Sequence, residues 1–185
     1  DEIAEQGQRF LGWRRVPTDN ATLGSGAKQG EPVVEQVFVE AAREISGDAF
    51  ERQLYLIRKQ SYHEIRSLGL EQVDLYSACS FSTKVIVYKG QLTPEQLPAY
   101  YADLSDPAMI SHLAIVHARF STNTFPSWSR AQPMRLLCHN GEINTLQGNV
   151  NWMRARQAQL RSDLFGSQFD RLFPLVDPET SDSGM

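Results

Sequence analysis

The chain has 185 residues, of which 41% are hydrophobic and 22% charged, a mixture typical of a folded globular domain and not of a disordered or collagen-like chain. The formal net charge of -4 gives no indication of a nucleic-acid partner, and no apolar run is long enough to span a membrane. Two cysteines are too few for a disulfide scaffold and suit a reducing compartment such as the cytoplasm.

Two strands are predicted near the N-terminus. Residues 6–17 are typical of an edge strand that ends at Pro17, because proline cannot donate a backbone hydrogen bond to a neighbouring strand. Residues 32–39 are rich in β-branched side chains and predict a strand that is covered on at least one face. The Gly- and Ser-rich segment 18–31 between them predicts a loop.

Two helices are predicted in the central part of the chain. Segment 48–68 predicts an amphipathic helix that stops at Gly69, because apolar residues recur at helical spacing at Phe50, Leu54, Ile57, Ile65 and Leu68. Thr93 and Gln96 form the pattern of a capping box, with proline at the first helical position, and predict a helix that runs to about residue 102.

The remaining apolar segments predict further strands and a last helix. The predicted strands are 75–80, 84–88, 112–120 and 134–139, the last two of them buried. Asn144 or Thr145 can cap a helix whose apolar face is Leu146, Val150, Met153 and Leu160, with Arg154, Arg156 and Arg161 facing solvent. This order of elements predicts a mixed α+β fold with helices packed on sheets.

Two polar segments, 117–123 and 138–144, directly follow the two predicted buried strands. Arg119 lies on an otherwise apolar strand, where a guanidinium needs an anionic partner because it stays protonated. That partner is either an internal Asp or Glu, as in an ordinary ion pair, or the carboxylate of a ligand held by a bidentate clamp.

Asn140 and Gly141 also allow two interpretations. Asn-Gly is a common hairpin turn, but the Asn amide and the Gly backbone N–H can also form an oxyanion hole. Such a site requires a nucleophile, and neither Cys138 nor Cys79 has the surroundings of an activated thiol; both fit buried structural cysteines.

The other polar residues near these segments favour structural roles. His117 and His139 are expected to be hydrogen-bonded packing residues that fix the loops, and no His, Cys or carboxylate spacing predicts a metal site. In the acidic segment 177–183, Ser181 or Asp182 can cap a following helix.

These segments carry a resemblance to a known family. The stretches HARFSTNTFPSW and CHNGEINTLQGNVNWMRAR, followed by the SDS element at 181–183, resemble the glutaminase domain of glutamate synthase, a class II glutamine amidotransferase with an N-terminal nucleophile. Upstream segments such as LGWRRVP, EPVVEQVFV and VIVYKG extend the resemblance over nearly the whole chain. It implies a partial amidotransferase domain over 1–185 with a four-layer α/β/β/α sandwich of antiparallel sheets, incomplete at the N-terminus.

The resemblance also implies roles for individual residues. Arg119 would bind the α-carboxylate of L-glutamine with Thr122 beside it, and Asp182 would bind the α-ammonium group. Asn140, through its side-chain amide, and Gly141, through its backbone N–H, would form the oxyanion hole for the γ-amide carbonyl.

For the parent enzyme, the resemblance implies ammonia transfer to a synthase site that carries FMN and an iron–sulfur cluster and makes glutamate from 2-oxoglutarate. The expected partners are L-glutamine, the remainder of the glutamate synthase polypeptide, and ferredoxin or an NADPH-oxidising subunit, with no nucleic acid and no membrane. The expected compartment is the cytoplasm, or the plastid stroma in a photosynthetic eukaryote.

One departure from the family concerns the nucleophile, which in the family is an N-terminal cysteine that opens a Cys-Gly segment. Residue 1 is Asp, and neither Cys79 nor Cys138 is followed by glycine. We therefore expect a fragment that does not hydrolyse glutamine by itself. Alternatives are another class II amidotransferase, of the asparagine synthetase or glucosamine-phosphate synthase type, and a non-catalytic glutamine-binding module.

Overall fold

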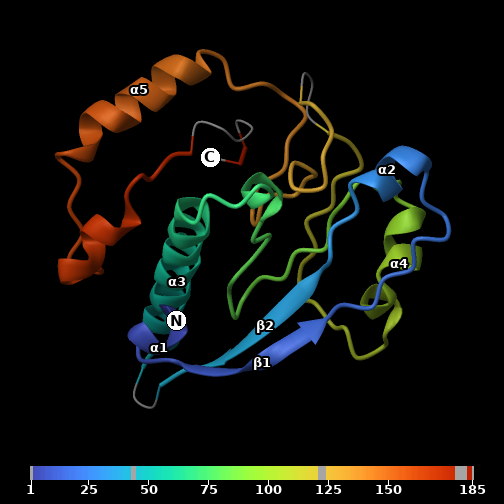
Figure 1. The fold of residues 1–185 in the computed structure, drawn as a ribbon, viewed down its shortest axis with the longest axis horizontal. Coiled ribbons are helices and arrows are strands. Elements are labelled where there is room, and N and C mark those ends of the chain that lie inside the picture. Colours follow the sequence, from blue (N-terminus) through green and yellow to red (C-terminus); the bar gives the residue numbers. More distant parts are fainter. Residues whose placement is uncertain (1, 43–44, 121–123, 178–182, 185) are drawn as a thin grey trace.

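The computed structural model describes residues 2–42, 45–120, 124–177 and 183–184 (Figure 1). In these ranges the helices and strands are α1 (Glu2–Glu5), β1 (Arg9–Arg15), α2 (Ser25–Gln29), β2 (Glu35–Glu40), α3 (Gly47–Ser67), α4 (Gln96–Tyr100) and α5 (Leu146–Gln157). Short 3-10 helices are η1 (Val73–Leu75), η2 (Ala102–Ser105) and η3 (Gly166–Leu172). Among the described residues, no helix is both long and apolar enough to cross a membrane.

The sheet is formed by the two strands predicted near the N-terminus. β1 and β2 pair antiparallel, from Arg9 opposite Glu40 to Arg15 opposite Glu35, with a bulge after Phe10. Both strands and the mixed α+β class are thereby confirmed. The segment 18–31 between them is not only a loop, because it contains α2.

The predicted amphipathic helix is confirmed as α3 and packs one apolar face into a core. The Ser46 side chain accepts a hydrogen bond from the Ala49 backbone N–H and so caps the helix, and Gly69 follows its end with a φ of 61°, which glycine adopts without strain. Phe50, Leu54 and Ile57 are buried, and the residues packed against them are Ile3, Val39, Ala41, Ile45 and Phe81. Of the other residues in the predicted apolar stripe, Ile65 is half-buried and Leu68 is exposed.

A second core lies around α4. Its buried members are Val16, Leu23, Tyr100, Tyr101 and Trp128. The predicted capping box is present, because the Thr93 backbone N–H donates to Gln96 Oε1 at 2.9 Å and the Gln96 N–H donates to Thr93 Oγ1 at 3.4 Å. The local sequence thus places α4 where Tyr100 at its end and Tyr101 after it are buried.

An ion pair links the sheet to this second core. Arg14 in β1 donates two hydrogen bonds to the Asp103 carboxylate in η2, at 2.7 and 2.6 Å. The Tyr88 hydroxyl donates a third at 2.8 Å. The hydrogen bonds from Arg14, and then that from Tyr88, lower the pKa of Asp103 to about 2.

The other predicted strands are wrong. No strand forms in 75–80, 84–88, 112–120 or 134–139. Met134 and Leu137 make a single bridge across a tight turn, and Leu113 and Val116 are 74% and 73% exposed, so the segments are not buried either. Alternating apolar residues fit a pleated surface, but a strand also needs a neighbouring backbone to pair with, and none of the described residues provides one here.

The predicted last helix is α5, followed by a segment that returns to α3 (Figure 1). Val150 is buried, Arg154 and Arg156 are exposed, and Leu160 lies beyond the helix. Thr145 precedes α5 with a φ of 59°, and its side chain makes no capping hydrogen bond.

The segment that returns to α3 is held by three contacts. Lys59 Nζ donates to Pro174 O at 2.7 Å, and the Tyr62 hydroxyl donates to Asp177 at 2.8 Å. The third contact is the ion pair between Arg171 and Glu2.

Candidate functional site

The structure brings the two polar segments, 117–123 and 138–144, into contact. His117 Nε2 and Asn140 Oδ1 are 2.8 Å apart, although 23 residues separate them in the sequence. His117 Nδ1 accepts a hydrogen bond of 3.3 Å from the backbone N–H of Arg119. A single imidazole therefore connects the segment that carries Arg119 with the side chain of Asn140.

The backbone just before Asn140 is held by a second side chain. Gln132 Oε1 accepts a hydrogen bond from the His139 backbone N–H at 2.6 Å, and Gln132 Nε2 donates to the His139 carbonyl oxygen at 2.7 Å. Gln132 is buried, so both of its polar ends replace bonds that water would otherwise make. This pair orients the chain at the point where it enters Asn140.

The loop that carries Gln132 rests on a buried lysine. Lys89 Nζ donates to the Ser129 carbonyl oxygen at 2.7 Å and lies 3.3 Å from Met134 Sδ. Burial lowers the pKa of the Lys89 ammonium group, since the charged form loses its hydration. The loop that carries Gln132 is thus held by a hydrogen bond from a buried ammonium group.

The C-terminal acidic segment also reaches this site. His139 Nε2 and Ser183 Oγ are 2.6 Å apart. Asp182, predicted to bind the α-ammonium group, is the neighbour of Ser183 but lies outside the described residues, as do Thr122 and Ser181. The contact of His139 with Ser183 links the C-terminal segment to the segment that carries Asn140.

Arg119 and Gly141 lie on the surface of this site. Arg119 is exposed on an irregular segment and not buried on a strand, and its guanidinium forms no ion pair with the residues that the structure describes. The interpretation of Arg119 as half of an internal ion pair therefore receives no support.

Asn140 and Gly141 do not join two strands, and a Cβ atom on Gly141 would meet nothing within 4 Å. Their hairpin interpretation is thus wrong, and the space beside Gly141 is open.

Neither cysteine is paired in a disulfide. Cys79 and Cys138 are half-buried free thiols, so the expectation that both are buried structural cysteines is wrong in its burial. Within the described ranges, no group of three or more His, Cys, Asp or Glu side chains could hold a metal ion.

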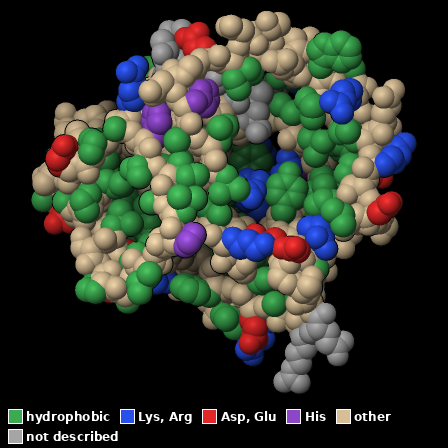
Figure 2. All heavy atoms as spheres, turned by 180° about the vertical axis from the view of Figure 1, so that it is seen from behind, with side chains coloured by type: hydrophobic (Ala, Val, Ile, Leu, Met, Phe, Trp, Pro, Cys, Tyr) green, Lys and Arg blue, Asp and Glu red, His purple; other side chains and the backbone are tan. Residues whose placement is uncertain are grey.

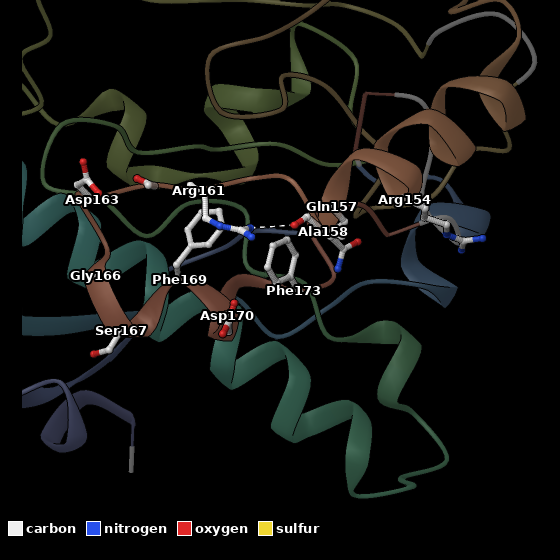
Figure 3. Close-up of a pocket in the computed structure, with 11 residues that line it drawn as sticks. Arg154, Gln157, Ala158, Arg161, Asp163, Gly166, Ser167, Phe169, Asp170 and Phe173 are labelled. Carbon is white, nitrogen blue, oxygen red and sulfur yellow. Dashed lines mark hydrogen bonds between the residues drawn. The ribbon is translucent and has the colours of Figure 1, made fainter.

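The surface also has hollows that the sequence did not predict. Figure 2 shows one face with a depression near its middle in which Lys or Arg side chains lie. Another hollow, of about 990 Å³, lies between the end of α5 and η3 (Figure 3). Arg161 lies in it and donates to the carbonyl oxygens of Ala158 and Leu160 at 2.9 and 2.6 Å. It contains none of the predicted site residues, so we assign no role to it.

Two contacts of the site were missed from the sequence. Nothing in the pattern around Gln132 indicates that its amide will pair with the backbone of His139. His117 was expected to fix a loop, and it does so, but its particular partner Asn140 lies on another segment. Contacts of this kind depend on tertiary packing and have no local signature.

All 185 residues of the chain match the family described as class-II glutamine amidotransferases. The chain is 50% identical over 184 residues to the glutamate synthase [NADPH] large chain of Bacillus subtilis and 50% identical over 189 residues to the glutamate synthase [NADH] of Schizosaccharomyces pombe. It is 46% identical over 181 residues to the chloroplastic ferredoxin-dependent glutamate synthase of Oryza sativa.

These matches cover 98% or 99% of this chain but small parts of the relatives. The chain spans 12% of the Bacillus subtilis protein, 9% of the Schizosaccharomyces pombe protein and 11% of the Oryza sativa protein. The similarity therefore concerns one region of much longer proteins.

Proposed function

This chain belongs to the class-II glutamine amidotransferase family, and from that membership we propose that it is part of the glutaminase site of a glutamate synthase. The reaction is hydrolysis of the γ-amide of L-glutamine to glutamate and ammonia. The relatives named above are glutamate synthases, which supports this parent over the asparagine synthetase and glucosamine-phosphate synthase alternatives.

The oxyanion hole is formed by Asn140 and Gly141 in this proposal. Attack on the γ-amide carbonyl places a negative charge on its oxygen, and the Asn140 side-chain amide and the Gly141 backbone N–H donate hydrogen bonds to it. The observation that carries the proposal is the 2.8 Å contact between His117 and Asn140, which brings the Arg119 segment to the Asn-Gly segment. The open space at Gly141 supports close approach of a substrate.

Arg119 binds the α-carboxylate of glutamine, with Thr122 beside it, and Asp182 binds the α-ammonium group. The exposed guanidinium of Arg119, without an ion pair among the described residues, supports this role because it leaves the fork of N–H donors available to a ligand. The contact of Ser183 with His139 supports a place for the C-terminal segment near the same site.

The nucleophile of the reaction is not provided by Cys79 or Cys138. Neither cysteine opens a Cys-Gly segment, and the described contacts of the site involve neither thiol. We therefore propose that the 185-residue polypeptide alone does not hydrolyse glutamine. Ammonia release from the purified polypeptide that is abolished by Cys138→Ser would contradict this.

The proposed fold of the complete domain is a four-layer α/β/β/α sandwich, of which residues 1–185 form a part. The family membership supports this architecture, and the antiparallel pair β1 and β2 is compatible with it.

The parent enzyme passes the ammonia to a synthase site with FMN and an iron–sulfur cluster. Such a cluster is held by cysteine thiolates, in some centres together with histidine. Among the described residues, no group of three or more His, Cys, Asp or Glu side chains could hold a metal ion, so we assign the cluster to no described residue of this chain.

Proposed partners are the remainder of the synthase polypeptide and an electron donor, either ferredoxin or an NADPH-oxidising subunit. The relatives named above include NADPH-, NADH- and ferredoxin-dependent enzymes, so the donor is left open. The proposed compartment is the cytoplasm, or the plastid stroma in a photosynthetic eukaryote.

The proposal is tested by the Asn140→Ala variant of the complete gene product. We expect the kcat of glutamine hydrolysis to fall by roughly 100- to 1,000-fold, because one donor to the oxyanion is lost. Glutamate formation from added ammonia is the control and should be retained, because it bypasses the amide hydrolysis. A loss of glutamine hydrolysis below about tenfold would contradict the oxyanion role.

A further inference from the structure

We infer that His117 is a positioning residue that determines which end of the Asn140 amide faces the substrate. The inference rests on the proposed function, because it assigns to His117 the orientation of an oxyanion donor. It starts from two hydrogen bonds of one imidazole, to the backbone of Arg119 and to the side chain of Asn140.

The first step is the protonation state of the His117 ring. Nδ1 accepts from the Arg119 backbone N–H at 3.3 Å, so Nδ1 carries no proton in the neutral ring. The proton is then on Nε2, because the bond made by one ring nitrogen sets the state of the other. Nε2–H consequently donates to Asn140 Oδ1 at 2.8 Å.

The second step concerns the two ends of the Asn140 side chain. Oδ1 only accepts hydrogen bonds and Nδ2 only donates them, although the two ends have almost the same shape. Rotation of the amide by 180° would place Nδ2–H against Nε2–H of His117, so that two donors face each other and a hydrogen bond is lost. His117 therefore holds Oδ1 toward itself and turns Nδ2 away.

The third step relates this orientation to catalysis. An oxyanion hole needs a donor aimed at the position of the developing charge, and the oxygen end of the amide would repel that charge. Both nitrogens of His117 have partners in the protein, so this side chain acts through Asn140 and not on the substrate. The same imidazole also connects the donor to the backbone of the proposed carboxylate-binding residue, Arg119.

The experiment compares two variants of similar size in the complete gene product, His117→Gln and His117→Met. Glutamine keeps an N–H donor for Asn140 Oδ1 and methionine has none. We expect His117→Met to lower the kcat of glutamine hydrolysis by about 10- to 100-fold with little change in KM, because a misoriented group is costly in the transition state. His117→Gln should retain most of the kcat. Equal kcat losses in both variants would overturn the inference.

A double variant separates this role from a general structural one. If His117 acts through Asn140, the His117→Met/Asn140→Ala double variant should be no slower than Asn140→Ala alone. Multiplied losses would overturn the inference. Thermal unfolding shows whether each variant is folded. His112→Ala replaces an exposed histidine five residues before His117 and is the control for the loss of a histidine from segment 112–120.

The outcomes also distinguish this inference from the proposed function. If Asn140→Ala leaves the kcat unchanged, the oxyanion role of Asn140 is wrong and the inference falls with it. If Asn140→Ala slows hydrolysis but His117→Met does not, the proposed function stands and only the positioning role of His117 is overturned.

Discussion

The Gln132 side chain pairs with the backbone of His139 through two hydrogen bonds, of 2.6 Å to its N–H and 2.7 Å to its carbonyl oxygen. In a sheet, the backbone of a neighbouring strand would bond the N–H and the C=O of one residue in this way; here the side-chain amide of Gln132 makes both bonds. It lies directly before Asn140, whose side chain is bound to His117, so the backbone and the side chain of this short segment are each held from a different part of the chain.

Substitution of Gln132 by leucine should destabilise the fold and slow the reaction. Leucine has a similar size but leaves two backbone groups of His139 without these bonds, which costs about 1–3 kcal/mol for a group left unsatisfied. The free energy of unfolding from urea denaturation measures the cost. Gln147→Leu, on the exposed face of α5, is the matched control and should change stability by less than about 0.5 kcal/mol. Similar free energies of unfolding for the two variants would show that the hydrogen bonds between Gln132 and His139 do not stabilise the fold.

Substitution of Arg119 by alanine should mainly raise the KM for glutamine in the complete gene product. Hydrogen bonds to a charged group contribute about 1.5–3 kcal/mol, which corresponds to roughly 10- to 100-fold in KM. Steady-state kinetics with glutamine and with ammonia measure the difference, because ammonia does not need the clamp. Arg156→Ala, an exposed arginine of α5, is the control. Equal loss of both activities would indicate that Arg119 is structural.

The ion pair of Arg14 and Asp103 should make the fold sensitive to acid. The pKa of Asp103 is lowered from its ordinary value of 3.8 to about 2 by its hydrogen bonds to Arg14 and Tyr88. A carboxyl with a lowered pKa contributes stability above its unfolded-state pKa, and this is lost as pH falls through the folded-state pKa. The Tm should therefore decrease as the pH is lowered from about 4 to about 2, the range between the unfolded-state and folded-state pKa values of Asp103. Thermal unfolding across this range measures the effect.

The Asp103→Asn variant identifies the source of that decrease. Asparagine keeps one acceptor oxygen for Arg14 but does not titrate, so the Tm should depend less on pH in this range. If the wild type and the variant lose Tm in parallel on acidification, Asp103 does not control the acid sensitivity.

Substitution of Gly90 by alanine should destabilise the second core. An added Cβ atom would lie 2.4 Å from Cζ3 of the buried Trp128 ring, so the ring or the backbone must shift. Overpacking of this kind costs typically about 1–3 kcal/mol. The urea midpoint measures the effect, and Gly24→Ala is the control because nothing lies within 4 Å of its added Cβ. A Gly90→Ala variant as stable as the control would show that the ring shifts at little cost.

Local features of the fold were predictable from the sequence because their determinants lie within a few residues of each other. The α3 helix follows from the spacing of Phe50, Leu54 and Ile57, and the start of α4 follows from the reciprocal bonds of Thr93 and Gln96. In both cases the pattern falls within two helical turns.

The predicted strands over 112–120 and 134–139 failed for the opposite reason. Their alternating apolar residues are compatible with a strand, but a strand forms only through pairing with a distant segment, which the local pattern does not contain. The same limit applies to the site. The polar residue types and their order identified Arg119, Asn140 and Gly141 as candidates, but not the contacts that hold them.

The sequence by itself thus determined the α+β class, the first two strands, the helices α3, α4 and α5, and the chemical groups available to the site. Only the tertiary structure decided that His117 meets Asn140, that Gln132 pairs with His139, and that Ser183 joins them. Helices and caps depend on neighbours in the chain, whereas each of these contacts depends on how segments 7 to 44 residues apart pack together.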